Sequence, residues 1–261
     1  MKKIIVTTSW DDGHKLDLKV ARILKNYSIK GTFYVCPRDR ELRQSELISS
    51  REIVMLSKDF EIGAHTMTHP LLPNDLATAW YKFRVKNLNK FFGENYNVQS
   101  VNNFSEAKKE IVDSKKYLEN LLDKRVISFC YPGGRHNSKI RDFVKESGFL
   151  YARTVERHKF EMSKNVYASP TSLHTFKQYQ DIFKIAWFSR WNPRAFFENM
   201  NWENLAKRAF DNTKEGGVYH IWGHSWIIDK KNEWDKLERV LSYIANRKNV
   251  RYLTNGELVT A

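Results

Sequence analysis

Short β-type runs alternate with helical stretches over the first part of the chain, and this alternation limits its possible folds most strongly. Ile4–Val6 and Thr32–Val35 are β-type runs, and between them apolar residues recur at helical spacing from Leu16 to about Tyr27. The same rhythm continues in predicted helices at 50–57, 105–122 and 138–146 and in predicted strands at 60–64, 126–130 and 150–154. Strands that alternate with helices predict an α/β fold with a parallel sheet, either open or closed into a barrel.

Two aromatic-rich stretches, residues 74–104 and 176–204, interrupt this rhythm. The sequence contains no Pro/Gly/Ser-rich linker and no internal repeat that would divide the chain. Its 261 residues are also the usual length of one (β/α) barrel domain. We therefore expect a single domain over residues 1–261, with an insertion near 74–104.

The chain is basic, with 44 Lys and Arg residues, 30 Asp and Glu residues and a formal net charge of +14. These cations are scattered, and no zinc-finger, RNA-recognition or helix-turn-helix signature accompanies them, so nucleic-acid binding is not expected. The charge indicates a solvated surface that can attract an acidic substrate. The N-terminus lacks a signal-peptide core, and no stretch approaches the roughly 20 apolar residues of a membrane span, so we expect a cytoplasmic protein. No feature of the sequence indicates an oligomeric state.

Three polar clusters follow predicted strands: residues 9–14 (SWDDGH), 65–70 (HTMTHP) and 220–225 (HIWGHS). In parallel α/β folds, the loops after the carboxyl ends of the strands build the active site. We therefore expect the three clusters to meet in one site.

His65 and His69 are four residues apart, so one helical turn would bring both imidazoles close enough to share a metal ion. Two His residues and one carboxylate leave positions open for water and substrate, which is typical of catalytic metal sites. Asp11 and Asp12 suit this chemistry, because one can bind the metal while the other takes a proton from water. The alternative is an Asp-Asp-Gly turn whose carboxylates cap the next helix. The nearby His pair favours the metal site.

At these residues the chain resembles the polysaccharide deacetylases, the carbohydrate esterase family four type. Residues 9–13 (SWDDG) resemble the first motif of that family, and residues 65–69 (HTMTH) resemble its second motif, about fifty residues later. Residues 129–134 (FCYPGG) look like a variant of the third motif, usually Arg-x-Pro-x-Gly. The resemblance runs to about residue 155, and the stretch at 74–104 is atypical of the family.

The resemblance implies a distorted (β/α) barrel of about seven parallel strands, single-domain, with a divalent metal. The metal is usually zinc, with cobalt, nickel or manganese as alternatives. By motif matching, Asp12, His65 and His69 correspond to the metal ligands, and Asp11 corresponds to the general base. The reaction implied is hydrolysis of an N-acetyl group, or sometimes an O-acetyl ester, on a sugar or glycan.

The third-motif loop would lie beside the substrate or behind the metal ligands. We place Tyr131, Pro132 and Gly133 there, with a backbone N–H near Gly133 helping to hold the oxyanion.

The family's third-motif Arg falls at Cys130 here, a position that we interpret as a small core residue. Without a cation nearby, the ionised form of Asp11 would be less stable and its orientation would be less well fixed. Arg153, near the end of the next predicted strand, is the first candidate to replace that Arg, and Arg135 is the second. The alternative for either residue is a place on the surface.

The family's general acid is a His at a strand end, and simple counting puts Trp222 at its position. His224 lies just beyond, at the expected mouth of the barrel, where it can protonate the leaving amine. His220 lies deeper, as a hydrogen-bonded core histidine or a group behind the ligands. Trp222 either packs in the core or forms an apolar wall for the substrate. His174 is a further residue that could line the mouth of the barrel.

We therefore expect a metal-dependent deacetylase acting on an N-acetylated sugar or glycan. The aromatic stretches either stack on sugar rings or bury a small extra core. One alternative is a metal-dependent amidohydrolase for a small non-sugar amide, since fold does not determine substrate. Another is a glycan-binding protein that keeps the metal site without turnover.

Overall fold

The computed structural model describes residues 2–73, 99–101, 103–176 and 181–260. Its strands are β1 (Ile4–Trp10), β2 (Thr32–Val35), β3 (Glu61–Ala64), β4 (Ser128–Cys130), β5 (Tyr151–Arg153), β6 (Leu173–His174), β7 (Val218–Gly223) and β8 (Val250–Tyr252). Its α-helices are α1 (Asp17–Asn26), α2 (Ser50–Leu56), α4 (Phe104–Leu122), α5 (Ser138–Glu146), α6 (Ile182–Phe188), α7 (Pro193–Asn199), α8 (Trp202–Asp211), α9 (Ser225–Lys230), α10 (Trp234–Ile244) and α11 (Glu257–Thr260). Three short 3₁₀ turns lie at Gln44–Glu46, Pro132–Gly134 and Val166–Ala168.

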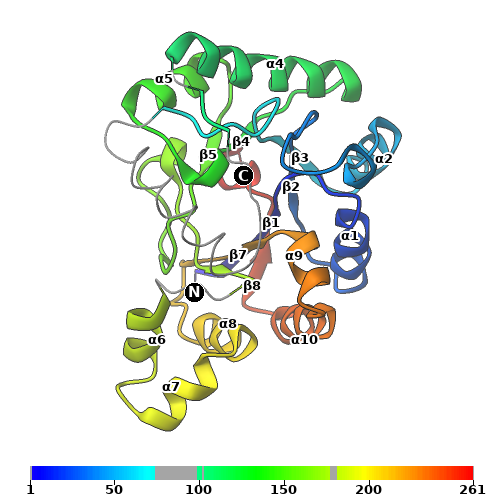
Figure 1. Cartoon of the computed structure of the whole chain (residues 1–261). Helices are drawn as coiled ribbons and strands as arrows, with labels where there is room; N and C mark the ends of the chain where they lie inside the picture. Colours follow the sequence, from blue (N-terminus) through cyan, green and yellow to red (C-terminus); the bar gives the residue numbers. More distant parts are fainter. Residues whose placement is uncertain (1, 74–98, 102, 177–180, 261) are drawn as a thin grey trace.

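The strands form one parallel sheet in the order β5-β4-β3-β2-β1-β7-β6, and β8 pairs with the start of β1. The helices lie around the outside of this curled sheet (Figure 1). β1 is almost wholly buried along its length, as expected for a parallel strand with both faces covered.

Residues 169–175 link the two ends of the sheet. The Ser169 N–H donates to Ala152 O at 2.9 Å, and the Thr154 N–H donates back to Ser169 O at 2.8 Å. Farther along, the Thr175 N–H donates to Trp222 O at 2.8 Å, on β7. The sheet therefore curls into a distorted barrel, which confirms the predicted fold class.

Local sequence signals set the helix boundaries near the site. Helix α2 begins with a capping box in which Ser49 and Glu52 exchange hydrogen bonds. Helix α4 begins after Asn103, whose side chain accepts from the Glu106 N–H at 2.8 Å, and it ends at Asp123, which has a left-handed φ of 49°. These signals agree with the predicted helices to within one residue.

Of the two aromatic-rich stretches, the structure describes most of residues 176–204 and little of residues 74–104. Residues 176–204 contain α6, α7 and the start of α8. Most of the predicted insertion near 74–104 lies outside the described residues. Within the part of the chain that is described, no helix has both the length and the apolar character needed to cross a membrane.

Candidate metal centre

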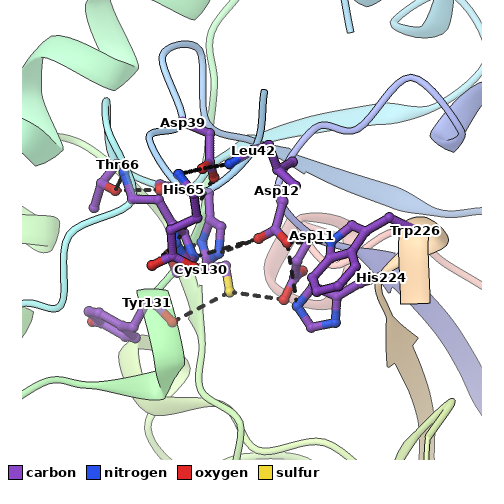
Figure 2. Close-up of polar contacts among 12 residues, drawn as sticks. Asp11, Asp12, Asp39, Leu42, His65, Thr66, Cys130, Tyr131, His224 and Trp226 are labelled. Atoms are coloured by element: carbon purple, nitrogen blue, oxygen red, sulfur yellow. Dashed lines mark hydrogen bonds and ion pairs between the residues drawn. The ribbon is translucent and has the colours of Figure 1, made fainter. Parts of the chain in front are cut away.

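The three polar clusters meet at the carboxyl ends of β1, β3 and β7 (Figure 2). Asp11 and Asp12 follow β1, His65 follows β3, and His224 follows β7 as the residue before α9. Since β1 lies between β2 and β7 in the sheet, the loops after it can reach both sides. The three clusters, distant in the sequence, therefore lie together in one place, as expected.

Asp12, His65 and His69 lie together as a possible set of metal ligands. Asp12 Oδ1 lies 3.6 Å from His65 Nε2 and 3.5 Å from His69 Nε2, and one ligand atom from each residue lies within 4.8 Å of the others. Atoms that each bind one zinc ion at about 2 Å in a tetrahedron would be roughly this far apart.

The protonation of His65 suits metal binding. Its Nδ1 lies 2.8 Å from the Cys130 carbonyl oxygen, which can only accept, so the ring proton belongs on Nδ1 and the Nε2 lone pair faces Asp12. Burial and the nearby His69 lower the pKa of His65 to about 4, so the ring is neutral at pH 7. Asp12 Oδ1 is buried and has no hydrogen-bond donor among the described residues. Two facing acceptors repel unless a cation lies between them, so these residues fit a divalent metal.

His69 is surrounded by carboxylates. Its Nδ1 lies 3.3 Å from Glu41 Oε1 and 4.0 Å from Asp39 Oδ2. Burial would lower the pKa of His69, but Glu41, Asp12 and Asp39 raise it to about 10, so the pocket favours positive charge at this ring. A carboxylate behind the outer nitrogen of a His ligand is a common way to orient the ring toward a metal.

The chain between the two His residues does not form the helical turn expected from their spacing. Thr66 and His69 have left-handed φ values of 65° and 60°. Glu110, on α4, accepts from the Met67 and Thr68 N–H groups, each at 2.9 Å. The carboxylate of Glu110 thus holds a loop that brings both imidazoles inward, with ring centroids 4.8 Å apart.

Asp11 pairs with Arg153, which comes from β5 and is fully buried. One guanidinium nitrogen contacts both carboxylate oxygens and lies 2.9 Å from Cys130 Sγ. Cys130 and Arg153 are direct neighbours in the β4–β5 ladder, so Arg153 approaches the site one strand away from Cys130. Burial would raise the pKa of Asp11, but Arg153 and the nearby imidazoles lower it below its ordinary value.

A second set of possible ligands, Asp11, His65 and Cys130, also lies close together. Arg153 already places its positive charge against Asp11 and Cys130, and burial raises the pKa of that thiol well above its usual value. The first set, around Asp12, is therefore the better metal site. Cys130 is buried, as interpreted from the sequence, but it borders the site.

On the opposite side of Asp12 lie His224 and Trp226. His224 Nε2 is 3.7 Å from Asp12 Oδ2, and the Trp226 indole N–H donates to the same oxygen at 2.9 Å. His220 lies deeper in β7, where its Nε2 is 2.9 Å from Ser9 Oγ. His224, and not His220, therefore reaches the metal ligands.

Trp222 lies behind the site. It is only 3% exposed, its ring stacks 4.5 Å from the Arg153 guanidinium carbon, and its edge meets His174 at 4.3 Å between centroids. Of the two roles predicted for Trp222, packing in the core and forming a wall for the substrate, these contacts favour packing, because Trp222 packs against Arg153 and His174.

The third-motif loop follows β4 as a 3₁₀ turn. Gly133 has a φ of 58°, a left-handed conformation that favours glycine. The turn's own hydrogen bonds use the N–H groups of Gly134 and Arg135, not that of Gly133. Tyr131 is buried and donates its hydroxyl to Tyr167 O at 2.9 Å, while Pro132 is buried in the turn. Tyr131 therefore supports the loop from behind.

Three groups around the candidate ligands were not predicted from the sequence: Trp226, Glu110 and Glu41. Each lies far in sequence from the residue that it contacts, and none belongs to a motif of metal ligands. Trp226 alone had a local signal, because it follows the third polar cluster by one residue.

Comparisons with known proteins indicate the family and the fold of this chain. A family model described as polysaccharide deacetylase matches residues 1–152, which is more than half of the chain. A comparison with curated proteins found no match.

Solved structures share the fold at low identity. A putative polysaccharide deacetylase from Mycobacterium smegmatis matches with a TM-score of 0.58 and 14% identity, covering 99% of this chain and 90% of that one. A family 4 acetyl xylan esterase from Clostridium thermocellum, in complex with a cobalt ion, matches with a TM-score of 0.53 and 14% identity, covering 98% and 90%. A Streptococcus pyogenes deacetylase in complex with acetate matches with a TM-score of 0.47 and 18% identity, covering 63% of this chain. This chain spans 62% of that deacetylase, less than two thirds of its length. From the match of its first 152 residues, the chain belongs to the polysaccharide deacetylase family.

Proposed function

We propose that this protein is a metal-dependent hydrolase that removes an acetyl group from a sugar or glycan. The observation that carries this proposal is the buried Asp12 Oδ1, which lacks a donor among the described residues and faces the Nε2 atoms of His65 and His69. When a divalent metal is bound by these three residues, it would polarise the acetyl carbonyl and make water more acidic.

Asp11 is the proposed base. It would take a proton from the water that adds to the acetyl carbonyl carbon. Arg153 keeps the carboxylate ionised and oriented toward the site by pairing with it. This arrangement supports turnover, because the third-motif cation absent at position 130 is supplied from β5.

His224 is the proposed acid. It would give a proton to the departing amine nitrogen as the bond from that nitrogen to the acetyl carbon breaks, which yields acetate and a free amine. Its Nε2 lies on the Asp12 side of the ring, close to where the acetyl group would bind. The Gly133 N–H, outside the turn's own hydrogen bonds, is the proposed donor to the developing oxyanion.

The proposed substrate is an N-acetylated sugar or glycan, and an O-acetyl ester would react through the same groups. This substrate class rests on membership of the polysaccharide deacetylase family. The net charge of +14 favours an acidic glycan among the candidates. We also propose that residues 1–261 form one catalytic domain, with an insertion near 74–104.

Acetate release from a panel of N-acetylated saccharides tests the proposal. The zinc-loaded wild type would be compared with Asp11→Asn and His65→Ala, with metal content measured for each protein. We expect release by the wild type, at least a 100-fold loss in Asp11→Asn with metal retained, and loss of both metal and activity in His65→Ala.

Other outcomes would indicate different functions. Stoichiometric metal without acetate release from any saccharide, but with hydrolysis of a small cyclic amide, would indicate the amidohydrolase alternative. Metal and saccharide binding without turnover would indicate a glycan-binding protein.

A further inference from the structure

We propose that His174 is a positioning residue that holds the His224 imidazole in place for proton transfer. The catalytic part of this proposal rests on the proposed function of His224. The contact itself is a feature of the barrel: His174 ends β6, and its Nε2 lies 3.3 Å from His224 Nδ1.

His174 is placed firmly by the sheet. It is the register partner of Trp222 in the β6–β7 ladder, its ring meets the Trp222 ring edge at 4.3 Å, and it is only 3% exposed. His224 follows Trp222 by two residues, so its imidazole lies beside that of His174, with ring centroids 5.4 Å apart. A buried ring fixed by two strands can therefore limit the rotation of a partly exposed one.

The other nitrogen of His174 is satisfied whether or not it carries the proton. The Phe176 N–H donates to His174 Nδ1 at 3.0 Å, and the Phe176 carbonyl oxygen lies 3.1 Å from the same nitrogen. If Nδ1 is bare it accepts from the N–H, and if it is protonated it donates to the carbonyl. His174 Nε2 is therefore able either to donate to His224 or to accept from it.

Both arrangements leave the reactive nitrogen of His224 in the same place. With the bond between His174 Nε2 and His224 Nδ1 in either direction, the His224 Nε2 faces Asp12 Oδ2 at 3.7 Å. Burial and the positive field of neighbouring groups lower the pKa of His174 to about 3, so it remains an uncharged partner throughout. An uncharged partner orients His224 without adding a negative charge beside Asp12.

Steady-state kinetics of two substitutions test the catalytic part. His174→Phe removes the hydrogen bond at similar volume, whereas His174→Gln keeps an amide that can donate or accept at the position of Nε2. We expect His174→Phe to lower kcat about 10-fold or more with KM changed less than about 2-fold, and His174→Gln to recover most of kcat. In a His224→Gln background, adding His174→Phe should change kcat less than about 2-fold, because the two residues act as a unit.

Nitrogen NMR of the histidine rings tests the contact without any activity. In metal-free, ¹⁵N-histidine-labelled protein, we expect the His224 nitrogens to report one dominant tautomer in the wild type and in His174→Gln, and a mixture in His174→Phe. An unchanged His224 tautomer in a folded His174→Phe variant would overturn the proposal, as would an unchanged kcat. A wild type that releases no acetate but shows the NMR change would refute the proposed function and support the contact.

Discussion

At the scale of single residues, the two oxygens of Asp12 have different partners. Oδ1 faces the two imidazoles, and Oδ2 accepts from the Trp226 indole and lies near His224. An indole N–H on Oδ2 would restrain the carboxylate so that Oδ1 is the oxygen available to hold a metal. Groups of this kind behind the ligands commonly contribute 10- to 100-fold to metal affinity.

We therefore expect Trp226→Phe to weaken zinc binding by about 10-fold, because Asp12 loses its donor while the apolar ring stays in place. Competition with a chromogenic zinc chelator measures this. Trp191→Phe is a matched control, since Trp191 is 74% exposed and should leave the affinity unchanged. Equal affinity in both variants would contradict a restraint by Trp226.

The pairing of Asp11 with Arg153 predicts a large effect on stability. Arg153→Leu leaves a buried carboxylate without its cation, so the free energy of unfolding at pH 7 should fall by about 3–5 kcal/mol. Adding Asp11→Asn removes the unpaired charge and should restore about half of that loss or more. Urea unfolding of the two variants measures this. A double variant no more stable than Arg153→Leu would show that the unpaired Asp11 carboxylate is not the cause of the loss.

At the scale of secondary-structure elements, α4 holds the loop that carries the His pair. The Glu110 carboxylate accepts from two backbone N–H groups and from the Thr68 hydroxyl at 2.8 Å. These bonds stabilise a loop whose left-handed residues, Thr66 and His69, are unfavourable for non-glycine side chains. A helix distant in sequence thus determines the geometry of the second motif.

Glu110→Ala should therefore weaken zinc binding about 10-fold and lower the free energy of unfolding by about 1–3 kcal/mol, because partly buried donors of the loop lose their acceptor. Calorimetric zinc titration and urea unfolding measure the two effects. Glu106→Ala, one turn earlier on α4 and exposed, is the control and should change zinc affinity little. A Glu110→Ala variant that binds zinc as tightly as this control would be inconsistent with such a role.

Helices α8 and α10 are joined by Glu203 and Arg239. Glu203 accepts from Arg239 Nε at 3.0 Å, and this bond, opposed by partial burial, lowers the pKa of Glu203 to about 2. A lowered pKa contributes stability above the ordinary pKa of Glu, near 4.3, and that contribution disappears as pH falls toward 2.

We expect Glu203→Gln to reduce stability by about 1 kcal/mol at pH 7, a value discounted for the solvent exposure of Arg239. The difference between the variant and the wild type should shrink as pH falls from about 4 to about 2. Urea unfolding across this pH range measures it. A difference that stays constant with pH would show that Glu203 contributes through packing rather than charge.

At the scale of the whole molecule, closure of the barrel positions the side of the site that bears His174. β7 and residues 169–175 approach closely, and a Cβ on Gly223 would lie 2.0 Å from Thr175 Oγ1 and 3.1 Å from Thr175 Cβ. Because Thr175 is buried, it has little room to move. The absence of a side chain at Gly223 is thus a condition for bringing β6 against β7.

Gly223→Ala should force these segments apart, at a cost of about 1–3 kcal/mol in unfolding free energy. Thermal unfolding should show a lower Tm. Thr175→Ala in the same background should recover part of the loss by removing the hydroxyl oxygen that lies nearest to the new Cβ. No recovery would place the strain elsewhere in the barrel.

The fold class, the elements around the first three motifs and the candidate metal ligands that face one another could all be predicted from the sequence. This was possible because alternating periodicities specify parallel α/β folds, and because the ends of neighbouring parallel strands must converge. The helical turn predicted between His65 and His69 was wrong. The spacing of the two residues does not reveal that the Glu110 carboxylate stabilises a loop with left-handed residues there.

Which distant groups contact the candidate ligands became clear from the three-dimensional arrangement alone. Arg153 reaches Asp11 because β4 and β5 are paired in one register, and Trp226 reaches Asp12 because α9 begins beside the end of β1. His174 meets His224 because the barrel closes through residues 169–175. Such contacts depend on strand order, register and closure, which arise from packing of the whole chain, so the sequence offers candidates such as Arg153 and His174 without showing which residues they contact.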